Sequence, residues 1–176
     1  MITRSLLNVV PTMAQREILR WLFIAIVTAS LVGCASMQDV VHHGFGFDFI
    51  DDSPDAELLD YRYGNSRNPA AKNSQGMLSQ GKSKQQLETY GGMLRGDELY
   101  VKWLLRSTGE IHEDTVDLRK RLPTDIENCR IYFLVRGPQL YVYLITPQRR
   151  ANNDPPNGPR ATSYLRTVTL YPGQPN

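Results

Sequence analysis

The sequence predicts an all-β domain, either an antiparallel β-sandwich or an open barrel of about seven or eight short strands, preceded by a signal-peptide helix. Three observations support this fold class. After residue 42, apolar residues recur mostly with period two rather than 3.6, which is the spacing of a strand with one buried face. Turn signals such as Gly64-Asn65, Ser107-Thr108-Gly109 and Gly137-Pro138 separate the alternating segments. Beyond residue 34, only Asp114–Leu122 could form a single helical turn.

The first three strand candidates lie between residues 43 and 94. HGFGFDFI, residues 43–50, places three phenylalanines on one face, and LLDYRY, residues 58–63, aligns Leu59, Tyr61 and Tyr63. LETYGGML, residues 87–94, contains a Gly-Gly pair and fits the alternation less well. Residues 64–86 carry almost no apolar side chains, so we expect an exposed loop there.

The remaining candidates follow in quick succession. ELYVKWLLR, residues 98–106, aligns Leu99, Val101, Trp103 and Leu105 on one face and is followed by IHEDTVDL, residues 111–118. RIYFLV (130–135) and LYVYLIT (140–146) flank a Gly-Pro turn and predict a hairpin. SYLRTVTLY, residues 163–171, is the last candidate, and residues 146–161, rich in Pro, Asn and Gly, form the second expected exposed loop.

The N-terminal segment has the pattern of an export signal. Arg16 and Arg20 precede the apolar run of residues 21–33, which ends in small residues. Thirteen helical residues rise only about 20 Å, less than the roughly 30 Å hydrocarbon core of a bilayer. We therefore expect residues 1–33 to be removed, with Met13 as an alternative start. Residues 34–42 then form a tether, and residues 43–176 form a single β-rich domain.

The end of this segment carries a recognisable processing motif. Leu31-Val32-Gly33-Cys34 resembles the lipobox of type II signal peptides in bacterial lipoproteins. The resemblance implies that the Cys34 thiol is acylated and that Cys34 becomes the first residue of the mature chain, anchored through acyl groups such as palmitate. Each buried methylene contributes about 0.8 kcal/mol, so two or three chains bind a membrane almost permanently. Ala35, where inner-membrane retention signals carry Asp, implies the outer membrane, with the domain facing the periplasm.

The charge balance gives no indication of a nucleic-acid partner, and we expect none. Residues 1–33 hold three of the 20 basic and one of the 18 acidic residues, which leaves 17 of each in the mature chain. The charges are segregated, because acidic residues gather in 39–60 and arginines in 130–166. The two regions could lie side by side and neutralise each other, or they could form opposed patches for a partner.

Candidate catalytic and metal sites are weak in this sequence. Cys129 has no second cysteine once Cys34 is acylated, so we expect it to be buried as a small apolar residue. His112 and Asp114 share one strand face, where a hydrolase could use an oriented base, but the sequence lacks a Gly-x-Ser-x-Gly elbow. We therefore expect no enzyme, no cofactor, no metal and no catalytic residue.

The expected function is binding. Arg136, Tyr141 and Tyr143 could present a sheet face to a flat ligand, a glycan or another strand, and form the candidate partner surface. The segment from Arg95 to Ile145 resembles a group of uncharacterised proteobacterial lipoproteins, a resemblance that implies no activity. We expect a non-enzymatic, membrane-anchored envelope lipoprotein that binds a protein or envelope component. The alternatives are an accessory or immunity-type lipoprotein that captures one effector or secretion component and, last, a hydrolase.

Overall fold

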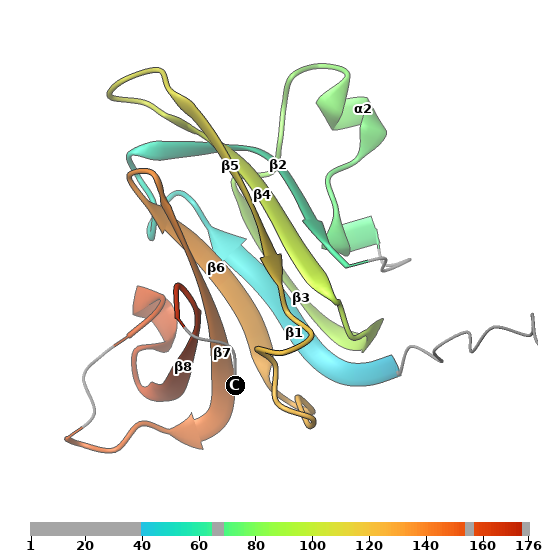
Figure 1. The fold of residues 1–176 in the computed structure, drawn as a ribbon, viewed down its shortest axis with the longest axis vertical. Coiled ribbons are helices and arrows are strands. Elements are labelled where there is room, and N and C mark those ends of the chain that lie inside the picture. Colours follow the sequence, from blue (N-terminus) through green and yellow to red (C-terminus); the bar gives the residue numbers. More distant parts are fainter. Residues whose placement is uncertain (1–39, 65–68, 154–156, 174–176) are drawn as a thin grey trace, which may run out of the picture. The chain divides into compact units, whose positions relative to one another are not determined.

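The computed structural model describes residues 40–64, 69–153 and 157–173. Its strands are β1 (Val40–Asp48), β2 (Ala56–Tyr63), β3 (Gln86–Leu94), β4 (Glu98–Leu105), β5 (Ile111–Asp117), β6 (Arg130–Arg136), β7 (Gln139–Arg149) and β8 (Leu165–Tyr171). They form two sheets, one of five strands in the order β3-β1-β6-β7-β8 and one of three in the order β2-β4-β5 (Figure 1). The all-β prediction is confirmed, as a two-sheet sandwich rather than a closed barrel. The signal segment and most of the tether lie outside the described residues.

Each strand candidate of the sequence overlaps one observed strand. β1 already begins at Val40, so residues 40–42, assigned to the tether from the sequence, belong to the sheet. The sheets are not purely antiparallel, because Gly44–Gly46 of β1 pair in parallel with Arg130–Tyr132 of β6. These two strands are joined through the other sheet and not by a hairpin, so no turn fixes their relative direction.

The core lies between the inner faces of the two sheets. Phe45, Phe47 and Phe49 are buried as the alternation predicts, and the ring of Phe45 stacks on Tyr63 of β2 at 4.9 Å between centroids. Leu99, Val101 and Trp103 of β4 close the core from the smaller sheet, with no more than 1% of their surface exposed. Burying a side chain of this size contributes about 1.5–3 kcal/mol, so this apolar layer is the main source of stability.

A β-bulge in β2 corrects one detail of the sequence pattern. Strict alternation places Leu59 with Tyr61 and Tyr63 on the inner face, but Leu58 is the fully buried leucine. The pairing with β4 shifts between Leu58 and Asp60, and the extra residue moves the preceding part of the strand to the opposite alternation.

The two expected exposed loops contain structure. In 64–86, the short helical turns η1 (Pro69–Ala71) and α2 (Gln75–Leu78) precede β3, and Ala71 and Asn73 are buried. In 146–161, β7 continues to Arg149, and the turn η2 (Arg160–Thr162) follows a buried Pro159. Both stretches are therefore partly packed against the sheets.

The sandwich has two ends that matter below. The Val40 end contains Val40, the β3–β4 turn (95–97) and the β5–β6 connection (118–129), at the bottom of Figure 1. It is fastened by Asn128 N–H, which donates to His42 O at 2.8 Å, and by Arg95, whose guanidinium donates to Thr124 O at 2.8 Å. The hairpin end contains the β1–β2 connection (49–55), the β4–β5 hairpin and the β6–β7 hairpin.

Candidate binding groove on the larger sheet

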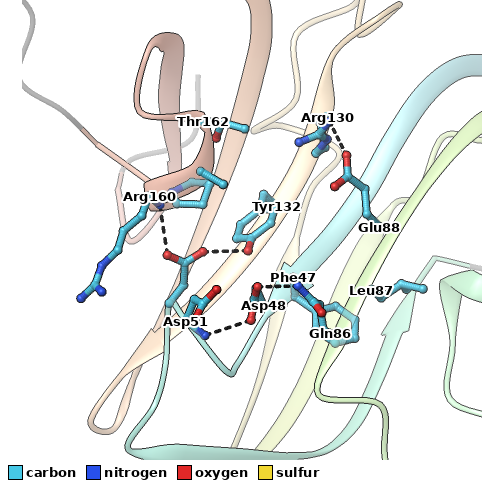
Figure 2. A pocket seen from close by; sticks show the side chains of 13 residues that line it. Phe47, Asp48, Asp51, Gln86, Leu87, Glu88, Arg130, Tyr132, Arg160 and Thr162 are labelled. Atoms are coloured by element: carbon cyan, nitrogen blue, oxygen red, sulfur yellow. Dashed lines mark hydrogen bonds and ion pairs between the residues drawn. The ribbon is translucent and has the colours of Figure 1, made fainter.

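An open groove of about 780 Å³ lies on the outer face of the larger sheet (Figure 2). Strands β1, β3 and β6, the β1–β2 connection and the η2 turn supply its walls. The lining residues are Phe47, Asp48, Asp51, Asp52, Gln86, Leu87, Glu88, Arg130, Tyr132, Pro159, Arg160, Ala161 and Thr162.

Glycines on the outer face of β1 explain why the sheet is hollow here. In the alternation of HGFGFDF, the phenylalanines point inward and Gly44 and Gly46 point outward. A Cβ at Gly46 would lie 2.8 Å from Leu87 O and 3.7 Å from the Tyr132 ring, and one at Gly44 would lie 2.8 Å from the Tyr90 ring. Side chains of β3 and β6 therefore rise on both sides of a low β1 floor.

One wall is built around Asp52. Its Oδ2 accepts a hydrogen bond from the Tyr132 hydroxyl at 2.8 Å, and its Oδ1 accepts one from Arg160 N–H at 3.0 Å. Burial, followed by the hydrogen bond to the Asp52 carboxylate, raises the pKa of Tyr132 far above its usual value, so the phenol stays protonated and donates. Asp52 thus joins the β1–β2 connection, β6 and η2.

The opposite wall consists of further paired polar groups. Asp48 Oδ2 accepts a hydrogen bond from Gln86 Nε2 at 2.7 Å, while its Oδ1 accepts from the Ile50 and Asp51 amides and closes the turn after β1. Arg130 pairs with Glu88 at 2.5 Å, across β1. The side chain of Arg130 is 24% exposed, so this ion pair is partly shielded from solvent.

The interior of the groove is acidic. Four carboxylates and two guanidinium groups line it, but the guanidinium of Arg160 points away from Tyr132 and Asp48 in Figure 2. Arg130 is neutralised by Glu88. No hydrogen bond or ion pair among the described residues engages the carboxylate of Asp51, which is exposed. The groove therefore suits a ligand that carries positive charge.

The predicted partner surface lies on the same sheet, over β6 and β7. The guanidinium of Arg136 lies 5.6 Å from the ring centroid of Tyr141, and the rings of Tyr141 and Tyr143 stack at 6.3 Å. Tyr143 is only 4% exposed because the backbone at Gly158 packs against its ring. Only Arg136 and Tyr141 of this trio reach solvent. The processing motif Leu31–Cys34 lies outside the described residues.

His112 and Asp114 do share the inner face of β5, but they have different partners. The His112 ring stacks on Trp103, and its Nε2 lies 3.6 Å from a Glu110 carboxylate oxygen. Asp114 instead hydrogen-bonds Tyr171 of β8 and raises the pKa of that phenol. His112 and Asp114 thus close the edge between the two sheets. They do not form a joint acid–base site.

Other motifs in the sequence also have structural partners. Asp117 forms an ion pair with Arg119 at 2.7 Å. No group of three or more His, Cys, Asp or Glu residues is placed to hold a metal ion in the ranges that the structure describes. Cys129 is buried as expected, and burial raises its thiol pKa. In the β3–β4 turn, the Arg95 guanidinium donates to the backbone carbonyls of Leu122 and Thr124, and Gly96 N–H donates to the Tyr63 hydroxyl oxygen.

Comparisons with known proteins found no match, because no protein-family model, no curated protein and no solved structure matches this chain. Across 40–64, 69–153 and 157–173, the helices are all too short to cross a bilayer. The sequence did not predict the groove, because Asp52 and Tyr132, which meet in its wall, are 80 residues apart. Only the alternation of glycine with phenylalanine in HGFGFDF could have indicated a hollow outer face on β1.

Proposed function

We propose that this protein is a lipid-anchored, non-enzymatic binding protein of the bacterial cell envelope. The anchor is acylated Cys34, as the resemblance of Leu31–Cys34 to a lipobox implies, and Ala35 favours the outer membrane with the domain facing the periplasm. The observation that carries the binding role is the acidic groove on the outer face of the larger sheet. Its floor and walls are fixed by strands and paired side chains, so the site is largely formed before a ligand arrives.

The partner that fits the groove is a protein or envelope component with a basic segment. Asp51 offers a carboxylate without a partner among the described residues. Asp52 follows it in the same connection, and Asp48 at the end of β1 also lines the groove. Attraction between opposite charges speeds association and weakens as salt is added. The same acidic interior supports the alternative, an accessory or immunity-type lipoprotein that captures one effector or secretion component.

The anchor is tested by metabolic labelling. Cells that produce the protein are fed labelled palmitate, and we expect label on the wild type and none on Cys34→Ser, which should leave the membrane fraction. An unlabelled wild type, or a Cys34→Ser protein that fractionates like the wild type, contradicts the proposal.

The groove is tested by photocrosslinking in intact cells. A photoreactive residue at Ala161, exposed in the lining of the groove, should trap a defined species, whereas the same residue at Ile111, 59% exposed on the smaller sheet, should not. Glu88→Gln should reduce the yield of crosslinked product from position 161, and so should high salt in isolated envelopes. An identical product from both positions, or a yield that neither change affects, argues against the groove.

A hydrolase built on His112 stays the least favoured function. Its ring is stacked on Trp103 and paired with Glu110, an arrangement that serves the edge of the sandwich. A His112→Ala protein that retains every phenotype of the wild type would dispose of this alternative.

A further inference from the structure

We propose that the Val40 end of the sandwich faces the membrane that holds Cys34, and that the groove opens toward the aqueous compartment. This inference rests on the proposed function, because it requires an acylated Cys34. It specifies the partner further: the ligand of the groove is a water-soluble molecule or the soluble part of one, and not a lipid or membrane-embedded segment of the anchoring bilayer.

The length of the tether limits how far the Val40 end can lie from the membrane. Five residues, 35–39, separate Cys34 from the first residue of β1. A fully extended chain spans at most about 3.5 Å per residue, so the six steps from Cys34 to Val40 cover about 20 Å. Because the acylated thiol must stay at the level of the lipid headgroups, Val40 lies within about 20 Å of them.

The groove runs from the middle of β1, where Arg130 lies beside Gly44, to the far end of the strand, where its carboxylates at Asp48, Asp51 and Asp52 are found. Eight residue-to-residue steps lead from Val40 to Asp48, which at about 3.3 Å each corresponds to roughly 26 Å. Asp51 and Asp52 follow in the connection at the hairpin end. β1 is a rigid spacer between the two points, because every residue from Val40 to Asp48 is paired with β3.

Charge opposes the inverted orientation. If the domain lay with its groove against the bilayer, the carboxylates of Asp48, Asp51 and Asp52 would approach headgroups, many of which are anionic, at a distance where repulsion is not screened. The Val40 end has exposed carboxylates of its own, at Asp97, Asp125 and Glu127, but Arg119, Lys120 and Arg121 in the same segments offset them. That end therefore carries no net negative charge, and its approach to the membrane has no such cost.

The test uses the full-length, acylated protein in vesicles of phosphatidylethanolamine and phosphatidylglycerol that contain a headgroup-attached quencher. Single cysteines at Val40, Asn128, Ile50 or Asp51, all exposed, carry an environment-sensitive fluorophore. Cys129 is buried, and a Cys129→Ala background keeps it unlabelled. We expect quenching at Val40 and Asn128, at the near end, to exceed that at Ile50 and Asp51 several-fold.

The outcomes separate the orientation from the anchor. Equal quenching at both ends, or stronger quenching at Ile50 and Asp51, overturns the orientation while acylation, checked by mass on the same sample, still stands. A wild-type protein without the acyl mass overturns the proposed function and the orientation with it. Cys34→Ser protein carrying the same labels should show little quenching at either end.

Discussion

Replacing Tyr63 by Phe should destabilise the fold strongly, because its hydroxyl connects three elements of the core. His43 Nδ1–H donates to Val41 O at 2.8 Å, which leaves His43 Nε2 to accept a hydrogen bond from the Tyr63 hydroxyl at 3.0 Å. The same hydroxyl oxygen accepts a hydrogen bond from Gly96 N–H at 3.0 Å. His43 and Tyr63 are both fully buried, and Gly96 is buried with them.

The magnitude follows from the two groups that Tyr63→Phe leaves without a partner. A buried donor or acceptor that loses its hydrogen bond costs about 1–3 kcal/mol, so the Gly96 amide and His43 Nε2 together should lower the free energy of unfolding by about 2–6 kcal/mol. The ring itself stays, so no cavity contributes.

The assay is urea unfolding at pH 8 followed by tryptophan fluorescence, with Tyr164→Phe as the matched control. Tyr164 is 61% exposed, and loss of its hydroxyl should change stability by less than about 0.5 kcal/mol. If Tyr63→Phe were as stable as Tyr164→Phe, the hydrogen-bonded connection from Val41 through His43 to Gly96 would not hold the core as described.

Three further outcomes are expected. Burial lowers the pKa of His43 below its usual 6.5; since unfolding lets the ring take up a proton, the free energy of unfolding should be constant above pH 6.5 and fall below it. The slope from this group is at most about 1.4 kcal/mol per pH unit, and His43→Gln, compared by urea unfolding, should lack it. Gly46→Ala should cost about 1–3 kcal/mol because its Cβ meets a β3 carbonyl oxygen at 2.8 Å. Gly76→Ala, with open space around it in α2, should be neutral or stabilising in the same urea-unfolding assay. The carboxyl of Asp117, bonded by Arg119, should titrate with a pKa of about 2 in an NMR titration, and an ordinary value near 4 would contradict that pairing.

Local alternation was enough to find the strands. β4 is the clearest case, because Leu99, Val101, Trp103 and Leu105 recur at every second position and the structure buries each of them as predicted. β3 fits the pattern less well but still forms, since β1 pairs with it along its whole length. Tertiary pairing here overrides the weak intrinsic preference of a strand that contains Gly91-Gly92.

Alternation of apolar and polar residues could not predict the bulge in β2 or the parallel pairing of β1 with β6. A one-residue shift exchanges the two faces of a strand, so the choice between Leu58 and Leu59 depends on the partner β4 and not on β2 alone. The direction of β6 relative to β1 depends on a chain path that crosses to the smaller sheet and returns.

The sequence by itself determined the class of fold, the positions of the strands and the inward phenylalanines of β1, because a period of two is a local property of the chain. It also contains the one motif on which the proposed anchor depends. Only the tertiary structure decided where the binding groove lies, since Asp52, Tyr132 and Arg160 come together from three distant segments. It likewise decided that Tyr143 is covered and that His43 is a buried link in the core, because burial and hydrogen bonding depend on neighbours that are remote in sequence.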